Sequence, residues 1–198
     1  DVTYHEFKHE SEALGTGLAS LGITDCHVAM VSENSYYWIL TYVTVLNSSG
    51  VYVPVDKELP FDEIMNILRH SDSEVVFYSG AFEREFRERA DELPQIKYFI
   101  GIDLAPELAD GRFVSREALM AKGEELLEAG DDTYLSLESD DAELKMLVNT
   151  SGTTGVAKGV MLSLHNLVSS VYYGLQVSTV FSTCLSVLPY HHTYEADC

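Results

Sequence analysis

The sequence predicts an α/β protein with helices on both faces of a doubly wound, mostly parallel sheet. Short apolar runs, which predict buried strands, alternate along the chain with segments whose apolar residues recur at helical spacing. This alternation favours a parallel sheet, because parallel strands need a crossover between them that is usually a helix. The chain has 198 residues, of which 46% are hydrophobic, so it is long enough for one sizeable core. We therefore expect a single domain.

The first helix has a recognisable start and end. Glu6 follows Thr3 at the spacing of a capping box. Phe7 and Leu14 belong to an apolar series at helical spacing, and Gly22 predicts the end of the helix.

The later elements continue the alternation. Apolar runs predict strands at residues 27–32, 51–55, 75–78, 98–102, 144–148 and 182–188. The segments between them predict helices at residues 35–46, 60–70, 81–90, 115–129 and 163–177. Pro60 suits a first helical turn, and Ser163 suits an N-cap. Residues 81–90 carry the mixed charges of a surface helix, and residues 130–141 are expected to be irregular.

Residues 150–160 form the most informative segment, Thr-Ser-Gly-Thr-Thr-Gly-Val-Ala-Lys-Gly-Val. Glycines let a backbone turn tightly and direct several N–H groups into one concavity. Hydroxyls and a lysine add donors and positive charge, a combination that suits a polyphosphate. A flexible surface loop is the alternative. The apolar runs at 144–148 and 160–162, which predict two buried flanks, argue against it.

Two common phosphate-binding patterns do not match. The Walker pattern requires lysine directly after a glycine, whereas Lys158 follows Ala157. Gly15 and Gly17 resemble the start of the dinucleotide pattern, but Ser20 stands where its last glycine belongs, and these residues lie in a helical pattern.

The segment instead resembles the phosphate-binding signature of the adenylate-forming enzymes, which include acyl-CoA synthetases, peptide-synthetase adenylation domains and luciferases. Its one departure is Ala157, where the family usually has proline. Residues 188–195, Leu-Pro-Tyr-His-His-Thr-Tyr-Glu, resemble the family's Leu-Pro-x-x-His motif. The paired histidines before Thr-Tyr-Glu look most like the long-chain fatty acid–CoA ligase branch. The resemblance covers the whole chain, so we expect residues 1–198 to be a truncated part of the family's large N-terminal AMP-binding domain.

The resemblance assigns roles residue by residue. His192 matches the catalytic histidine near the acyl carboxylate and the α-phosphate. Thr150 also matches the position whose hydroxyl contributes to the family's magnesium site. Lys158 would add charge near the phosphates or anchor the loop. The phosphate cradle would consist of Thr150, Ser151, Gly152, Thr153, Thr154 and Gly155.

The implied function is ATP-dependent activation of a carboxylic acid, most like a long-chain fatty acid, to an acyl adenylate, followed by transfer to coenzyme A. ATP, Mg²⁺ and coenzyme A are the implied cofactors and co-substrates. Two alternatives stay open: a module that loads an amino or aryl acid onto a carrier protein, and a non-catalytic nucleotide-binding domain. The family's adenine pocket, ribose-binding aspartate, magnesium-binding glutamate and catalytic lysine would lie beyond Cys198. We therefore expect the 198 residues alone to be inactive.

The composition of the chain argues against several classes of binding partner. The formal net charge of −20 repels nucleic acid and anionic lipid head groups. No apolar run is long enough for a membrane span. Three cysteines without a C-x-x-C pair indicate a reduced, cytoplasmic protein. A sheet edge exposed by truncation near residues 182–198 would favour self-association.

Other histidines carry weaker signals. His5 and His9 share a helix face, but two histidines without a third ligand do not make a zinc site. His165 lies one place later than a histidine of the family, so we expect a surface residue at a helix start. His191 is interpreted as a packing residue.

Overall fold

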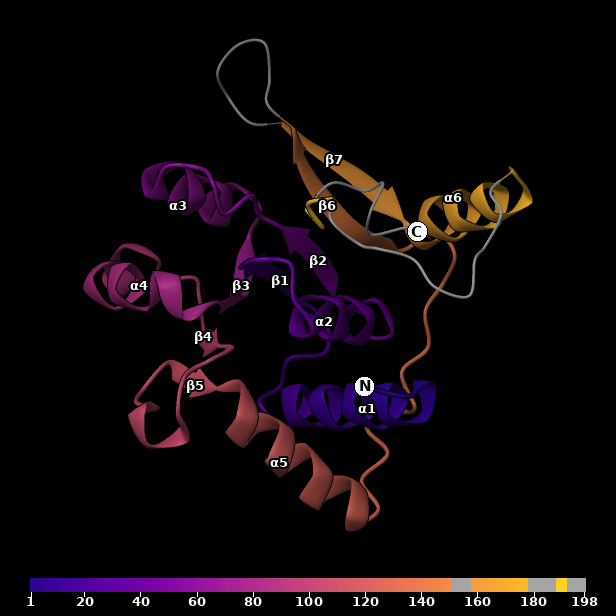
Figure 1. Cartoon of the computed structure of the whole chain (residues 1–198), viewed down its shortest axis with the longest axis horizontal. Coiled ribbons are helices and arrows are strands. Elements are labelled where there is room, and N and C mark those ends of the chain that lie inside the picture. Colours follow the sequence, from indigo (N-terminus) through magenta and orange to yellow (C-terminus); the bar gives the residue numbers. More distant parts are fainter. Residues whose placement is uncertain (151–157, 178–187, 192–198) are drawn as a thin grey trace.

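A computed structural model describes residues 1–150, 158–177 and 188–191, whose strands form one seven-stranded sheet (Figure 1). In spatial order, the strands are β5 (Phe113–Ser115), β4 (Tyr98–Gly101), β3 (Ser73–Tyr78), β1 (His27–Val31), β2 (Val51–Pro54), β6 (Leu144–Thr150) and β7 (Lys158–Ser163). Neighbouring strands from β5 through β6 are parallel, and β7 runs antiparallel to β6. The predicted mostly parallel sheet is confirmed.

Helices cover both faces of the sheet, as predicted. On one face lie α1 (Tyr4–Ser20), α2 (Tyr36–Leu46) and α5 (Arg116–Glu128), and on the other lie α3 (Phe61–His70) and α4 (Glu83–Arg89). Helix α6 (Leu164–Val177) follows β7. Short 3₁₀ turns occupy Gly80–Phe82, Ala90–Glu92 and Pro106–Leu108.

The strands explain why two cores form. Val28 and Met30 of β1 belong to the core beneath α1 and α2, whereas Ala29 and Val31 belong to the core beneath α3 and α4. Successive side chains of a strand point to opposite faces, so a strand buried on both faces is apolar throughout. This is why short continuous apolar runs predicted the strands correctly.

The first helix begins and ends as expected. The Glu6 carboxylate accepts from the Thr3 backbone N–H at 2.7 Å, and the Thr3 hydroxyl accepts from the Glu6 N–H at 3.2 Å, which is a capping box. After the helix, Gly22 has a φ of 76°, a left-handed conformation that costs glycine little.

Gly17 lies where α1 crosses α5, which explains its place in a helical pattern. A Cβ atom on Gly17 would lie 2.4 Å from the Leu119 carbonyl oxygen, and one on Gly123 would lie 1.8 Å from the Ala13 carbonyl oxygen. These glycines therefore allow two helices to approach closely, and the structure gives them no role in phosphate binding.

Strand β7 differs from the expectation of a second buried flank. Val160 is 43% exposed and Met161 is 67% exposed. Within the described part of the chain, β7 pairs only with β6 and forms an edge of the sheet, so no neighbour covers its apolar residues. The prediction of two buried flanks is wrong for this one.

One strand of the structure is not predicted, and one predicted strand lies almost wholly outside the described residues. Strand β5 is not predicted from the sequence, because three residues are too short for a periodic signal. The strand predicted at residues 182–188 lies outside the described residues except for Leu188, which is in a bend. The expected self-association edge is likewise described only at residues 188–191. It stays a prediction, although α6 exposes Tyr172, Tyr173 and Leu175.

Candidate functional site at the carboxyl edge of the sheet

The predicted phosphate-binding segment begins at the carboxyl end of β6. Tyr52 of β2 pairs with Met146 of β6 in a parallel register. Asp56 and Thr150 each come four residues after one member of this pair, so both lie at the carboxyl edge of the sheet. Ligands of open α/β sheets bind outside this edge.

The β6–β7 hairpin brings two of the predicted site residues together. Thr150 is the Cα partner of Lys158 across the two antiparallel strands. The segment between them contains Ser151, Gly152, Thr153, Thr154 and Gly155, all outside the described residues, as is the predicted catalytic residue His192. The strand context predicted for the segment is therefore present, and the roles of its side chains stay predictions.

A second segment, residues 188–191, lies at the same edge. The Asn34 side-chain Nδ2 donates to the Leu188 carbonyl oxygen at 2.6 Å, and the Tyr190 N–H donates to Asn34 Oδ1 at 3.1 Å. Asn34 follows β1, so this long-range contact carries the segment to the carboxyl end of the central strands.

His191 does more than pack. Its Nε2 atom lies 3.6 Å from Asp56 Oδ2, and its side chain is 19% exposed. Asp56 follows β2, so the contact joins the segment to a second central strand. Asn34 and Asp56 are not among the site residues predicted from the sequence. Their positions directly after parallel strands were the signal that could have identified them.

The chain path diverges at this point. After β1 the chain turns into α2 on one face of the sheet, and after the adjacent β2 it turns into α3 on the other face. Where neighbouring connections diverge in this way, the loops separate and leave room for a ligand. Asn34 and Asp56 lie on the two diverging loops.

The other histidines do not join this edge. His165 is exposed, and its backbone N–H donates to the Asp141 carbonyl oxygen at 2.9 Å. It stands at the start of α6, where the Asn166 N–H donates to the Ser163 hydroxyl at 3.3 Å, which confirms the predicted N-cap. Among the described residues, His5 and His9 belong to no group of three metal-ligating side chains.

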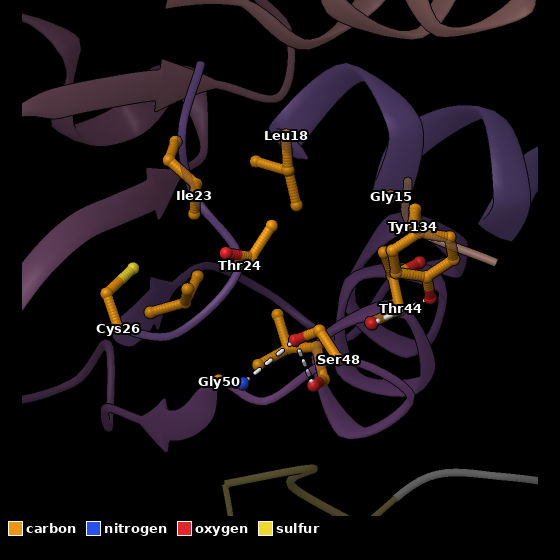
Figure 2. Close-up of a pocket in the computed structure, with 11 residues that line it drawn as sticks. Gly15, Leu18, Ile23, Thr24, Cys26, Thr44, Ser48, Gly50 and Tyr134 are labelled. Atoms are coloured by element: carbon orange, nitrogen blue, oxygen red, sulfur yellow. Dashed lines mark hydrogen bonds between the residues drawn. The ribbon is translucent and has the colours of Figure 1, made fainter. Parts of the chain in front are cut away.

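A narrow pocket lies at the opposite, amino edge of the sheet (Figure 2). Cys26, just before β1, and Gly50, just before β2, belong to its lining, and the Tyr134 hydroxyl donates to the Thr44 carbonyl oxygen at 2.9 Å beside it. Burial raises the pKa of the Cys26 thiol to about 11, and Glu74 adds to this effect. The thiol therefore stays protonated and unreactive at neutral pH. This pocket is not the predicted phosphate site.

None of the helices in the described part of the chain is long and apolar enough to cross a bilayer.

Comparison with known proteins finds relatives that are named as fatty-acid ligases. A medium-chain-fatty-acid–CoA ligase from Ectopseudomonas oleovorans is 27% identical over 195 residues, covering 96% of this chain and 35% of the relative. A long-chain-fatty-acid–[acyl-carrier-protein] ligase, AEE15, from Arabidopsis thaliana is 27% identical over 211 residues, covering 98% of this chain and 29% of the relative. The chain therefore spans about a third of these relatives' length.

The fold has counterparts among solved structures. The adenylation domain of a carboxylate reductase from Mycobacterium chelonae superposes with a TM-score of 0.82 at 21% identity, covering 98% of this chain and 33% of that one. The family described as AMP-binding enzyme matches residues 1–198. Together with the hairpin and its glycine- and hydroxyl-rich segment, this match over the full chain shows that the protein belongs to the AMP-binding, adenylate-forming enzymes.

Proposed function

We propose that residues 1–198 are the N-terminal part of the AMP-binding domain of an ATP-dependent acid–thiol ligase. The enzyme would activate a carboxylic acid, in our proposal a long-chain fatty acid, and transfer the acyl group to coenzyme A. The supporting observation is the β6–β7 hairpin, which pairs Thr150 with Lys158 at the carboxyl edge where α/β sheets bind ligands. The relatives' fatty-acid ligase names support the choice of acid.

The first half-reaction joins the acid to AMP. A carboxylate oxygen attacks the α-phosphorus of ATP, the bond to the β-phosphate oxygen breaks, and pyrophosphate leaves. The backbone N–H groups and hydroxyls of residues 150–155 would hold the β- and γ-phosphates, and Lys158 would add positive charge. Catalysis of this kind depends on positioning and charge stabilisation. Because the net charge of −20 repels ATP at long range, these contacts must be local.

The second half-reaction exchanges AMP for a thiol. The thiolate sulfur attacks the acyl carbonyl carbon, the bond between that carbon and the AMP oxygen breaks, and a thioester and AMP result. His192, which we propose as the catalytic histidine, would donate a hydrogen bond to the negative charge that develops in either step.

A magnesium ion suits this site only in part. Thr150 supplies one hydroxyl position, whereas Mg²⁺ prefers carboxylates, phosphates and water. No cluster of three ligating side chains occurs among residues 1–150, 158–177 and 188–191. Phosphate oxygens and water would therefore provide most of the ligands, and the ion would neutralise phosphate charge.

Three cysteines without a C-x-x-C pair support a reducing compartment such as the cytoplasm.

A carrier protein is the second candidate acceptor. The Arabidopsis thaliana relative is named as a ligase for acyl-carrier protein, so an enzyme of this family need not use coenzyme A. This candidate also includes amino and aryl acids as substrates. In both cases the first half-reaction is the same.

Pyrophosphate release tests the proposal. The enzyme containing this chain is assayed with ATP, Mg²⁺ and a panel of fatty, aryl and amino acids, and the thioester is then measured with coenzyme A or a carrier protein. We expect the highest release with a long-chain fatty acid and thioester formation with coenzyme A. An aryl or amino acid preference with carrier loading would favour the second candidate. Absence of release with every acid would contradict both. Residues 1–198 alone should form no acyl adenylate.

A further inference from the structure

The side-chain amide of Asn34 holds the backbone on both sides of Pro189. It donates to the Leu188 carbonyl oxygen at 2.6 Å and accepts from the Tyr190 N–H at 3.1 Å. A planar amide that makes both bonds presents the same donor and acceptor pair as a peptide group of a neighbouring strand. Two bonds to one rigid group restrict both the position and the rotation of the segment.

Asn34 itself lies between two elements. Strand β1 ends at Val31, and the next residue after Asn34, Ser35, is the N-cap of α2, where its hydroxyl accepts from the Trp38 N–H at 3.2 Å. Asn34 thus lies in the short connection between β1 and α2. Asn34 can therefore act as an attachment point for a segment that is far away in the sequence.

Two more contacts fix the same segment. The Tyr190 ring packs against Trp38, with ring centroids 5.3 Å apart, and His191 Nε2 lies 3.6 Å from Asp56 Oδ2. Trp38 belongs to α2, and Asp56 follows β2. The segment is thus attached at three points to the two central strands and the helix between them, directly before His192.

We propose that Asn34 is a positioning residue for the acid-activating reaction. This inference rests on the proposed function. By fixing the backbone at Leu188 and Tyr190, Asn34 holds the described segment that directly precedes His192 in the sequence, which we propose as the catalytic histidine. A catalytic group held in place before the reaction avoids an entropic cost during it, and a misplacement of about 1 Å can reduce the rate about 100-fold.

Two substitutions test the proposal. Asn34→Asp keeps the shape and the acceptor for the Tyr190 N–H, but it replaces the donor with an oxygen that repels the Leu188 carbonyl. Asn34→Ala removes both bonds. Asn66→Asp is the matched control, because the Asn66 side chain is exposed on α3 and accepts a surface hydrogen bond from Arg69.

The first measurement is made on this chain and needs no activity. Hydrogen exchange of the Tyr190 amide should accelerate in Asn34→Ala, accelerate less in Asn34→Asp, which keeps the acceptor, and stay unchanged in Asn66→Asp. The emission of Trp38, the one tryptophan in the sequence, should change when the Tyr190 ring leaves it. Unchanged exchange and emission in both Asn34 variants would overturn the proposal.

The second measurement is made on the enzyme that contains this chain. We expect kcat for pyrophosphate release to fall about 10- to 100-fold in both Asn34 variants. KM for ATP should change by less than about threefold, because the phosphate contacts remain. A residue with only a structural role would lower the amount of folded enzyme but leave kcat per folded molecule unchanged, and that result would overturn the proposal. A wild-type enzyme that releases no pyrophosphate contradicts the proposed function instead, and the exchange measurement still tests the Asn34 contact.

Discussion

Lys145 and Ser48 meet inside the protein, where the Lys145 Nζ atom donates a hydrogen bond to the Ser48 backbone carbonyl oxygen. The Lys145 side chain is fully buried on β6, and Nζ also donates to Ser139 Oγ at 2.8 Å and lies 3.0 Å from Glu143 Oε2. The start of β6 is thereby tied to the loop before β2 and to the connection from α5. A buried ammonium group is stable only with partners of this kind.

Replacing Lys145 with Met should destabilise the protein by about 1–3 kcal/mol. Methionine fills a similar volume, but it leaves the Ser48 carbonyl oxygen buried without its lysine donor. Urea unfolding measures the loss. Lys122→Met is the control, because Lys122 pairs with Glu125 on the surface at 3.1 Å, and its loss should be below about 0.5 kcal/mol. Equal stability of the two variants would contradict this account of Lys145.

Replacing Lys158 with Ala should lower kcat/KM for ATP about 10- to 100-fold in the enzyme. The expected magnitude corresponds to a lost hydrogen bond to a charged phosphate, whereas Thr154→Ala, which removes a neutral donor, should cost about 2- to 10-fold. Pyrophosphate release at varied ATP measures both effects, with Lys122→Ala as the control. Unchanged turnover in both variants would favour the non-catalytic reading of the loop.

Replacing Gly123 with Ala should cost about 1–3 kcal/mol, because the new Cβ atom would lie 1.8 Å from the Ala13 carbonyl oxygen and force α5 away from α1. Gly174 is the matched control. It also lies in a helix, but no described residue comes within 4 Å of its Cβ position, so Gly174→Ala should be neutral or stabilise by up to about 1 kcal/mol. Thermal unfolding measures the stability of both variants. A Gly123→Ala protein as stable as Gly174→Ala would show that the helices have room to adjust.

Stability should fall at alkaline pH in part because of Cys26. Burial raises the pKa of its thiol from 9.0 to about 11, so the folded state holds the proton more tightly than the unfolded state. The resulting stability is complete below about pH 9 and is lost as the pH rises towards about 11. Urea unfolding at about pH 8 and about pH 10.5 should show a smaller loss for Cys26→Ala than for the wild type. The change in the free energy of unfolding between the two pH values decides the test, because the cavity left by Cys26→Ala lowers stability equally at both. An identical change in the variant and the wild type would rule out this role of Cys26.

Local signals predicted most of the secondary structure correctly. The capping box at Thr3, the N-cap at Ser163 and the short apolar runs of the central strands depend on residues close together in the sequence. The glycine- and hydroxyl-rich segment after residue 149 indicated a phosphate site for the same reason, because the binding groups of a loop come from residues that are adjacent in the sequence.

The amino-acid sequence by itself thus determined the α/β class, the order of most elements and the family. Only the tertiary structure decided that β7 is an exposed edge strand, that Lys145 reaches Ser48, and that Asn34 holds Leu188 and Tyr190. These contacts join residues that lie far apart in the sequence. They depend on the spatial order of the strands and on which face each connection takes, and no local pattern of side chains encodes that order.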